Sequence, residues 1–185
     1  MILCLLWFEN SPHSQNDPPV PSSTMFASGK KFVESMNTLW SFDVLSQRLS
    51  KVFGLLDRRA ADQYKTLRKV AMENLAYLRG FNALDACLWP GRVLLFNRQT
   101  PCHRDSRNPP GEWTPLHAGG DFTEGGALFV HELNLRLRYL PGDLIFLRGH
   151  DLSHSVESWS GGQRLSAAYF SHQALWKYFK LSFSL

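Results

Sequence analysis

The hydrophobic period of the chain changes near residue 90, and this change limits the folds that it can adopt. From about residue 30 to residue 80, apolar residues recur at steps of three and four, which is typical of amphipathic helices. From about residue 90 the period shortens towards two, which is typical of strands. Helices followed by a run of strands predict an α+β chain whose core is mainly β-sheet.

The second half of the chain contains short strand-like segments separated by Gly- and Pro-containing turns, such as Pro90-Gly91 and Gly161-Gly162. Many short strands joined by such turns predict a β-sandwich or a barrel. The expected strands cover residues 92–98, 126–133, 135–140, 143–149, 153–159 and 163–171.

Two long helical segments are expected between about residues 30 and 82. Asp57 is the expected N-cap of the second helix, and Gly80 is its expected end. The segment 172–183, HQALWKYFKLSF, has the pattern of a short amphipathic helix. Five basic residues of the helical region either form a solvated helix face or follow a phosphate backbone; they are Arg58, Arg59, Lys65, Arg68 and Lys69.

The composition fits one globular domain. The chain has 185 residues, of which 44% are apolar and 19% charged, so it is long enough and apolar enough to bury a core. We expect a loop or disordered tail over residues 1–25 and a single domain over 26–185, with helices over about 30–82 and the β core over about 90–172. The net charge of +4 permits a polyanionic partner such as DNA without requiring one.

The cysteines and the apolar N-terminal segment indicate the cellular compartment in which the chain is expected. Cys4, Cys87 and Cys102 are far apart and form no CxxC pair, which argues against a disulfide scaffold or a zinc finger and fits a reducing compartment. The opening MILCLLWF stops at Glu9, lacks a basic flank and is shorter than the ~20 residues of a membrane span. We therefore expect an intracellular protein without a signal peptide or a membrane span, and no feature indicates a protein partner.

Two histidines and one acid have the residue types and the spacing of a metal site. His103 and Asp105 are two positions apart in PCHRDSR, at the expected end of a strand, and such residues share a face in extended chain. His154 lies on a later strand, which barrel closure can bring opposite them. Two imidazoles and one carboxylate on one face of an octahedral ion form the triad of non-haem Fe(II) oxygenases.

An arginine and a serine follow these residues. Arg164 and Ser166 are two apart after a Gly-Gly turn, so they share a face of their strand, and we expect this strand to pair with that of His154. An arginine binds a carboxylate through two hydrogen bonds, and a serine hydroxyl adds another. A dianion can therefore be held with one end on the metal and the other on Arg164.

The alternative interpretation is structural. It places His103 in a loop, His154 in a hydrogen-bonded core position and Arg164 in a surface ion pair. His150-Asp151 is a rival for the ligand positions, but adjacent residues of a strand face opposite sides.

Further polar residues flank the candidate site. Asn97, six positions before His103, either binds the dianion or closes a turn. Arg104, Arg107 and Trp113 either clamp a phosphate and stack on a base or have unrelated surface roles. The stretch 106–126 has no period and is expected to be a long loop. His117 within this stretch either contacts a substrate or faces solvent.

The motifs HRD, SHSV and GGQRLS together resemble those of the Fe(II)/2-oxoglutarate-dependent dioxygenases, over about residues 90 to 172. Within that superfamily, NRQTPCHRDSRN and YLPGDLIFLRGHDLSHSVESWSGGQRLSAAYFSH are most similar to the fungal branch of the TET/JBP oxygenases. The resemblance implies a double-stranded β-helix, or jelly roll, buttressed by N-terminal helices, with a short C-terminal helix. The Cys-rich zinc region of animal TET enzymes is missing from this chain.

The resemblance also implies site roles and cofactors. His103, Asp105 and His154 would bind Fe(II), Arg164 would bind the distal carboxylate of 2-oxoglutarate with help from Ser166, and O2 would be the second co-substrate. The implied activity is oxidation of the methyl group of 5-methylcytosine, or of thymine or another methylated base, in DNA, with a nuclear location if DNA is the substrate. Two alternatives stay open: a 2-oxoglutarate-dependent hydroxylase of a protein side chain or a small metabolite, and a jelly-roll binding module without catalysis.

Overall fold

The computed structural model describes residues 1–6, 17–82 and 85–184, and the part of the expected tail at 7–16 lies outside the described residues. The chain forms two compact units. The barrel unit consists of Met1 and Arg92–Phe170, and the helical unit consists of Ile2–Gly91 and Ser171–Leu185. The division into a tail and one domain stays a prediction.

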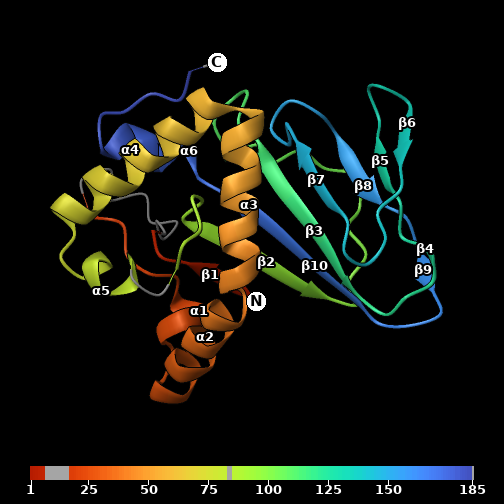
Figure 1. Cartoon of the computed structure of the whole chain (residues 1–185), viewed down its shortest axis with the longest axis horizontal. Coiled ribbons are helices and arrows are strands. Elements are labelled where there is room, and N and C mark those ends of the chain that lie inside the picture. The colour runs from red at the N-terminus through yellow and green to blue at the C-terminus, as the bar shows by residue number, and fades with distance from the viewer. Residues whose placement is uncertain (7–16, 83–84, 185) are drawn as a thin grey trace. The chain divides into compact units, whose positions relative to one another are not determined.

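The barrel unit is built from two antiparallel sheets and a short two-stranded ribbon (Figure 1). In the larger sheet, β10 lies between β2 and β3, and β3 pairs with β7. In the smaller sheet, β5 lies between β6 and β8, while β4 pairs with β9 in the ribbon. The strands are β2 (Gly91–Phe96), β3 (Thr114–Gly120), β4 (Glu124–Gly125), β5 (Leu128–Val130), β6 (Leu135–Leu137), β7 (Leu144–Leu147), β8 (His154–Val156), β9 (Trp159–Ser160) and β10 (Arg164–Phe170).

The core of the barrel unit is filled from both sheets, which explains the alternating pattern of the strands. Leu116 and Ala118 of β3 pack with Leu128 and Val130 of β5, and all four are buried. Alternate residues of each strand therefore face the inside, as in a sandwich of two sheets. An α+β chain with a mainly β core is confirmed.

Two expectations about the strands were wrong. The strand of His154 pairs with β5 and not with the strand of Arg164, because β9 intervenes and pairs with β4. The stretch 106–126 is not one loop, since residues 114–120 form β3 between β10 and β7. Pro115 and the Gly119-Gly120 pair are turn signals, and they masked the alternation of Thr114, Leu116 and Ala118.

The helical unit contains β1 (Ile2–Cys4), α1 (Ser23–Phe26), α2 (Gly29–Ser41), α3 (Asp43–Leu56), α4 (Arg58–Asn74), α5 (Leu78–Asn82) and α6 (Gln173–Tyr178). Asp57 caps α4 as predicted, because its side chain accepts a hydrogen bond from the backbone N–H of Ala60 at 2.9 Å. Gly80 does not end that helix: α4 stops at Asn74, and Gly80 lies within α5. The expected C-terminal helix is present but shorter, since Lys180 adopts a positive φ of 54°.

Aromatic side chains hold the helical unit together. The ring of Trp89 lies 4.8 Å from that of Phe53 and 5.0 Å from that of Tyr64. The chain beyond α6 returns to the same cluster, where the ring of Phe183 lies 5.4 Å from that of Trp176. These contacts join α3, α4 and α6 through rings that bury large apolar areas.

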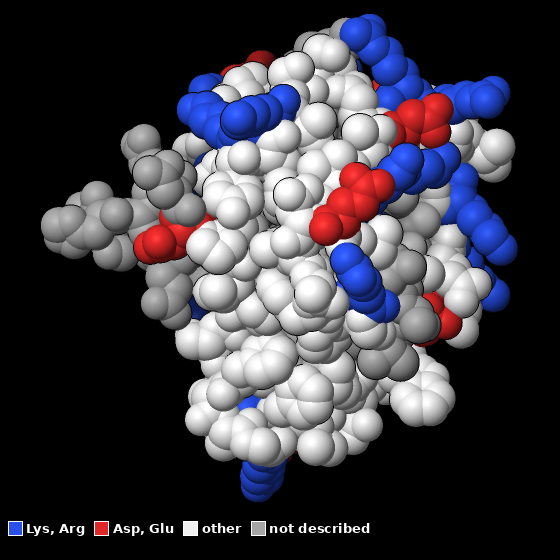
Figure 2. Space-filling view, turned by 90° about the vertical axis from the view of Figure 1, so that its left-hand side faces the viewer, with Lys and Arg blue, Asp and Glu red and all other residues white. Residues whose placement is uncertain are grey.

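The charged residues of the helical unit are mixed in sign. Figure 2 views the side on which α4 and α5 lie in Figure 1, and there Lys and Arg stand mostly towards the edges, with Asp and Glu among them. Lys65 pairs with Asp62 at 2.8 Å, and Arg68 donates to the backbone oxygens of Asp85 and Cys87. These contacts fit the solvated helix face better than a phosphate-binding one. In the described part of the chain, no helix has the length and apolar character needed to cross a membrane.

Candidate metal centre

His103 and His154 are brought together by the backbone. His154 begins β8, and His103 lies on the segment between β2 and β3. The N–H of His103 donates to the oxygen of His154 at 3.0 Å, and the N–H of His154 donates to the oxygen of His103 at 2.9 Å. Closure of the barrel thus places His154 opposite the HRD segment, as the sequence predicted.

The side chains of His103, Asp105 and His154 converge. One ligand atom from each lies within 4.8 Å of the others, and Nε2 of His103 is 3.6 Å from Oδ1 of Asp105. Ligands held at about 2.1 Å on one face of an octahedral ion lie about 3.0 Å from one another. The three side chains would therefore have to rotate towards one another to bind one cation together.

Both imidazoles are held in the form that leaves Nε2 available. Nδ1 of His103 lies 2.9 Å from the backbone oxygen of Pro101, and Nδ1 of His154 lies 3.0 Å from that of Leu152. A carbonyl oxygen only accepts, so Nδ1 carries the proton in each ring and Nε2 carries a lone pair when the ring is neutral. Metal-binding histidines are oriented by the same kind of contact.

The electrostatics of the three groups are coupled. The hydrogen bond with Asp105 raises the pKa of His103, against the effect of burial. Burial lowers the pKa of His154, which is 4% exposed, and so favours the neutral ring that binds metals. Burial by itself would raise the pKa of Asp105, but the hydrogen bond with His103, both imidazole charges and a hydrogen bond from Thr114 bring it below the ordinary value.

Arg164 is buried in an aromatic cage. It is 2% exposed, and its guanidinium carbon lies 4.9 Å from the ring centre of Tyr139, 5.3 Å from that of Trp159 and 5.5 Å from that of Phe122. Nη1 donates to Oγ of Ser166, whereas Nε and Nη2 have no hydrogen-bond partner among the described residues. Burial lowers the pKa of Arg164 and Tyr139 opposes this, but an arginine stays charged. The cage therefore holds a cation whose Nε and Nη2 atoms are available to donate hydrogen bonds.

One cavity is lined by the three proposed ligands and by residues that contact Arg164. Its volume is about 110 Å³, several times the space that a single water needs. His103, Asp105 and His154 line it together with Ser166 and Tyr139, two of the residues that contact Arg164. The other lining residues are mostly apolar; they are Val93, Leu95, Thr100, Leu116, Leu128, Val156, Ala167 and Ala168.

Asn97 directly follows β2, next to the first residue of the strand that carries Arg164, and it is not among the residues that line the cavity. Its Oδ1 accepts the backbone N–H of Arg164 at 2.8 Å, its own N–H donates to the oxygen of Arg164 at 2.8 Å, and its side-chain amide donates to Gln163. With φ at 46°, Asn97 has a backbone conformation that is common in turns, and its role in binding the dianion stays a prediction.

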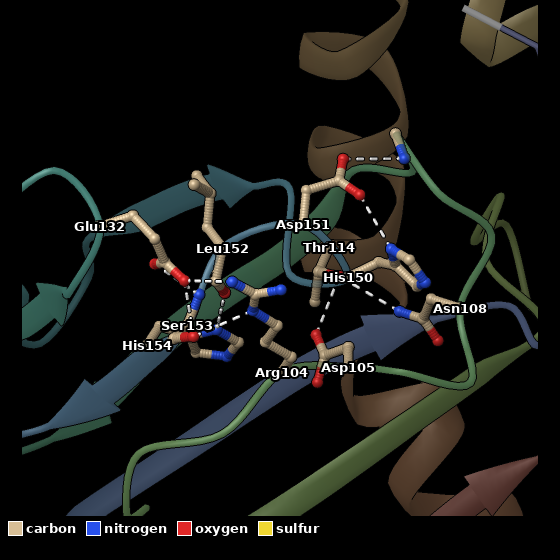
Figure 3. Close-up of polar contacts among 11 residues, drawn as sticks. Arg104, Asp105, Asn108, Thr114, Glu132, His150, Asp151, Leu152, Ser153 and His154 are labelled. Carbon is tan, nitrogen blue, oxygen red and sulfur yellow. Dashed lines mark hydrogen bonds and ion pairs between the residues drawn. The ribbon is translucent and has the colours of Figure 1, made fainter.

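The flanking residues are distributed over the surface. Arg104 donates to Oγ of Ser153 at 2.9 Å and to Glu132 at 2.5 Å, so it joins the segments that carry His103 and His154 (Figure 3). Arg107 is exposed. Trp113 is half-buried, and the guanidinium carbon of Arg148 lies 4.8 Å from its ring centre. None of these three is among the residues that line the cavity.

His117 and His150 are not among the residues that line the cavity. His117 is a β3 residue, and it faces away from Leu116 and Ala118 of the core, so it is not a loop residue that reaches the cavity. Its Nδ1 lies 3.2 Å from the backbone oxygen of Asp143. His150 pairs with Asp151 at 2.8 Å, and this carboxylate also accepts the N–H of Gly111 at 2.9 Å (Figure 3).

Sequence reasoning missed the residues that surround the proposed ligands. The cage residues Phe122 and Tyr139 are far from Arg164 in the sequence, Trp159 is nearer, and no periodic signal marks any of the three. Thr114, which donates to Asp105, was assigned to a loop. Gly149, the last residue of the predicted strand 143–149, is a signal that could have indicated a close approach of the backbone.

Known proteins are similar to this chain in sequence and in fold. No family model matches the sequence. The chain is 29% identical to Tet-like dioxygenase 1 of Naegleria gruberi over 144 residues, which cover 70% of this chain and 44% of that protein. The resemblance to the TET/JBP oxygenases is confirmed.

A solved structure, NgTET1 in complex with 5mC DNA, has a TM-score of 0.60 and 21% sequence identity to the chain. The match covers 84% of this chain and 55% of that one. The similarity shows the fold, so the jelly roll, or double-stranded β-helix, is confirmed for this TET-like chain. The chain spans about half the length of the relatives that it matches.

Proposed function

We propose that this TET-like chain is an Fe(II)- and 2-oxoglutarate-dependent dioxygenase that oxidises the methyl group of 5-methylcytosine in DNA. The observation that carries the proposal is one cavity lined by His103, Asp105 and His154 and also by Ser166 and Tyr139, which contact the caged guanidinium of Arg164. A buried cation with unsatisfied donors is costly unless an acceptor binds it. The distal carboxylate of 2-oxoglutarate fits this need, because an arginine binds a carboxylate through parallel hydrogen bonds.

The donor set fits Fe(II). His103, Asp105 and His154 supply two nitrogens and one oxygen, which is the set that non-haem Fe(II) oxygenases use on one face of the ion. Bound Fe(II), 2-oxoglutarate and O2 supply the oxidising chemistry. The chain itself would hold the ion, orient 2-oxoglutarate through Arg164 and Ser166, and keep the reaction in a mostly apolar cavity.

The substrate is proposed from the relatives. One relative is named a Tet-like dioxygenase, and the solved structure NgTET1 contains 5mC DNA. A base in a duplex reaches such a cavity only if it is turned out of the stack, which requires a grip on the phosphate backbone. DNA as the partner also implies a nuclear location. Arg104, Arg107, Trp113 and His117 stay predictions as substrate contacts.

The test is turnover on DNA. The chain is incubated with Fe(II), 2-oxoglutarate, O2 and 5-methylcytosine DNA, and the nucleosides are analysed by mass spectrometry while succinate is measured. We expect 5-hydroxymethylcytosine together with succinate, and neither product from His103→Ala. Succinate without an oxidised base would contradict the DNA substrate and leave the oxygenase. Absence of both products from the iron-loaded wild type would contradict the activity itself.

A further inference from the structure

We infer that Thr114 and Asn108 are positioning residues that fix the carboxylate of Asp105, so that only Oδ1 is presented to the cation. The inference deepens the proposed function and rests on it, because it concerns how one of the three proposed ligands is held. It assigns a role to two residues of the stretch between the HRD segment and β3.

The hydrogen bonds run in one direction. Nδ2 of Asn108 donates to Oγ1 of Thr114 at 3.2 Å, and Oγ1 of Thr114 donates to Oδ2 of Asp105 at 3.1 Å (Figure 3). The amide nitrogen of Asn108 has only protons to give, so the hydroxyl of Thr114 accepts there. Its single proton is then left for Asp105. Oδ2 is thus engaged by a donor whose own orientation is set by Asn108.

The hydrogen-bond relay from Asn108 through Thr114 to Asp105 is buried, and it is anchored in strand β3. Thr114 is 2% exposed and Asn108 is 3% exposed, so water does not readily replace either donor. Thr114 begins β3, where it pairs in register with Leu147 of β7. Asn108 is tied back to Asp105, because its backbone N–H donates to the backbone oxygen of Asp105 at 2.9 Å. The carboxylate is therefore connected to the sheet through buried hydrogen bonds, which are strongest when every member is satisfied.

The backbone of Gly149 lies against the carboxylate of Asp105. The backbone N–H of Asp105 donates to the oxygen of Gly149 at 2.8 Å. A Cβ at position 149 would lie 2.1 Å from Oδ2 of Asp105 and 2.9 Å from Oγ1 of Thr114. Oδ2 is confined between bare backbone and a hydroxyl, while Oδ1 faces His103.

A single carboxylate oxygen matters for the proposed chemistry. The triad occupies one face of an octahedral ion and leaves the opposite positions open. If Asp105 turned and bound through both oxygens, it would take one position that 2-oxoglutarate or O2 needs. The relay from Asn108 through Thr114 prevents this turn, because Oδ2 would have to give up its hydrogen bond.

The experiment compares metal binding by the intact chain and its variants. Mn(II), which does not react with O2 here, is titrated by calorimetry into the wild type, Thr114→Val and Thr114→Ser. Thr114→Val keeps the shape and removes the hydroxyl, so we expect Mn(II) binding about 10–100-fold weaker, the usual effect of losing a partner of a metal ligand. Thr114→Ser keeps the hydroxyl and should bind close to the wild type.

Two further measurements distinguish a specific effect on the Asp105 carboxylate from a general disturbance of the fold. The visible absorption bands of the Co(II)-loaded protein respond to coordination number, so Thr114→Val should change them and Thr114→Ser should restore them. Thr66→Val removes an exposed hydroxyl of α4, which donates to the backbone oxygen of Asp62 in the same helix, and it should change neither affinity nor spectrum. If Thr114→Val does not fold, Asn108→Ala tests the same relay, with an expected loss near the tenfold end of that range.

The outcomes distinguish the two proposals. Wild-type affinity together with an unchanged Co(II) spectrum in the folded relay variants overturns the role of Thr114 and Asn108 and leaves the proposed function standing. A wild type that binds no Mn(II) overturns both.

Discussion

Among single residues, Arg164 has surroundings that make the strongest demand on a ligand. Three aromatic rings surround its guanidinium, Ser166 satisfies Nη1, and Nε and Nη2 are left without a partner in the described chain. Truncating one partner of a buried charged pair costs about 2–5 kcal/mol. We therefore expect Arg164→Ala to weaken 2-oxoglutarate binding to the Mn(II)-loaded protein by at least about 30-fold, measured by calorimetry.

The matched variant is Arg164→Lys, which keeps the charge and loses the fork of donors. Its affinity for 2-oxoglutarate should fall between those of the wild type and Arg164→Ala. Mn(II) affinity without 2-oxoglutarate should stay near the wild-type value in both variants, because Arg164 is not one of the proposed ligands. An unchanged 2-oxoglutarate affinity in Arg164→Ala would remove the guanidinium from the proposed site.

Among the elements, helix α4 offers the most direct test of a feature read from the sequence. Asp57 precedes the apolar period of α4, and its carboxylate binds the N–H of Ala60. Replacing such a cap by alanine costs about 1 kcal/mol. Asp57→Ala should lower the free energy of unfolding by about this amount in urea denaturation followed by circular dichroism, whereas Asp57→Asn, which retains a capping oxygen, should lose less. Equal stability of Asp57→Ala and the wild type would show that the cap is not needed.

The elements that were predicted well are those whose signal is local. The helices up to Asn74 and most strands follow from spacing that neighbouring residues carry. The pairing of β8 with β5, in contrast, depends on contacts between segments far apart in the sequence, which spacing does not encode. Strand β3 was missed because Pro115 and Gly119-Gly120 are turn formers that the sheet tolerates here.

At the scale of the whole chain, the proposed site was predictable because of its residue types. Histidine, aspartate and arginine are costly to bury without a role, so their spacing stood out before the fold was known. Tyr139, Trp159 and Thr114 are ordinary core or strand residues, and their roles follow only from which side chain they contact. Sequence reasoning therefore identified the groups expected to bind ligands and missed those that hold these groups in place.

Binding of the metal and of 2-oxoglutarate should also change the stability of the whole chain. A ligand that binds only the folded state raises the free energy of unfolding, by about 2.7 kcal/mol at a concentration 100 times its Kd. Mn(II) at this excess should stabilise the chain by that amount in urea denaturation, and 2-oxoglutarate should add to it only when Mn(II) is present. His103→Ala should lose most of the Mn(II) effect, whereas Arg164→Ala should keep it and lose the increment from 2-oxoglutarate. If Mn(II) stabilised His103→Ala as much as the wild type, the ion would be bound elsewhere in the chain, because His103 is one of the three side chains that converge on the cavity.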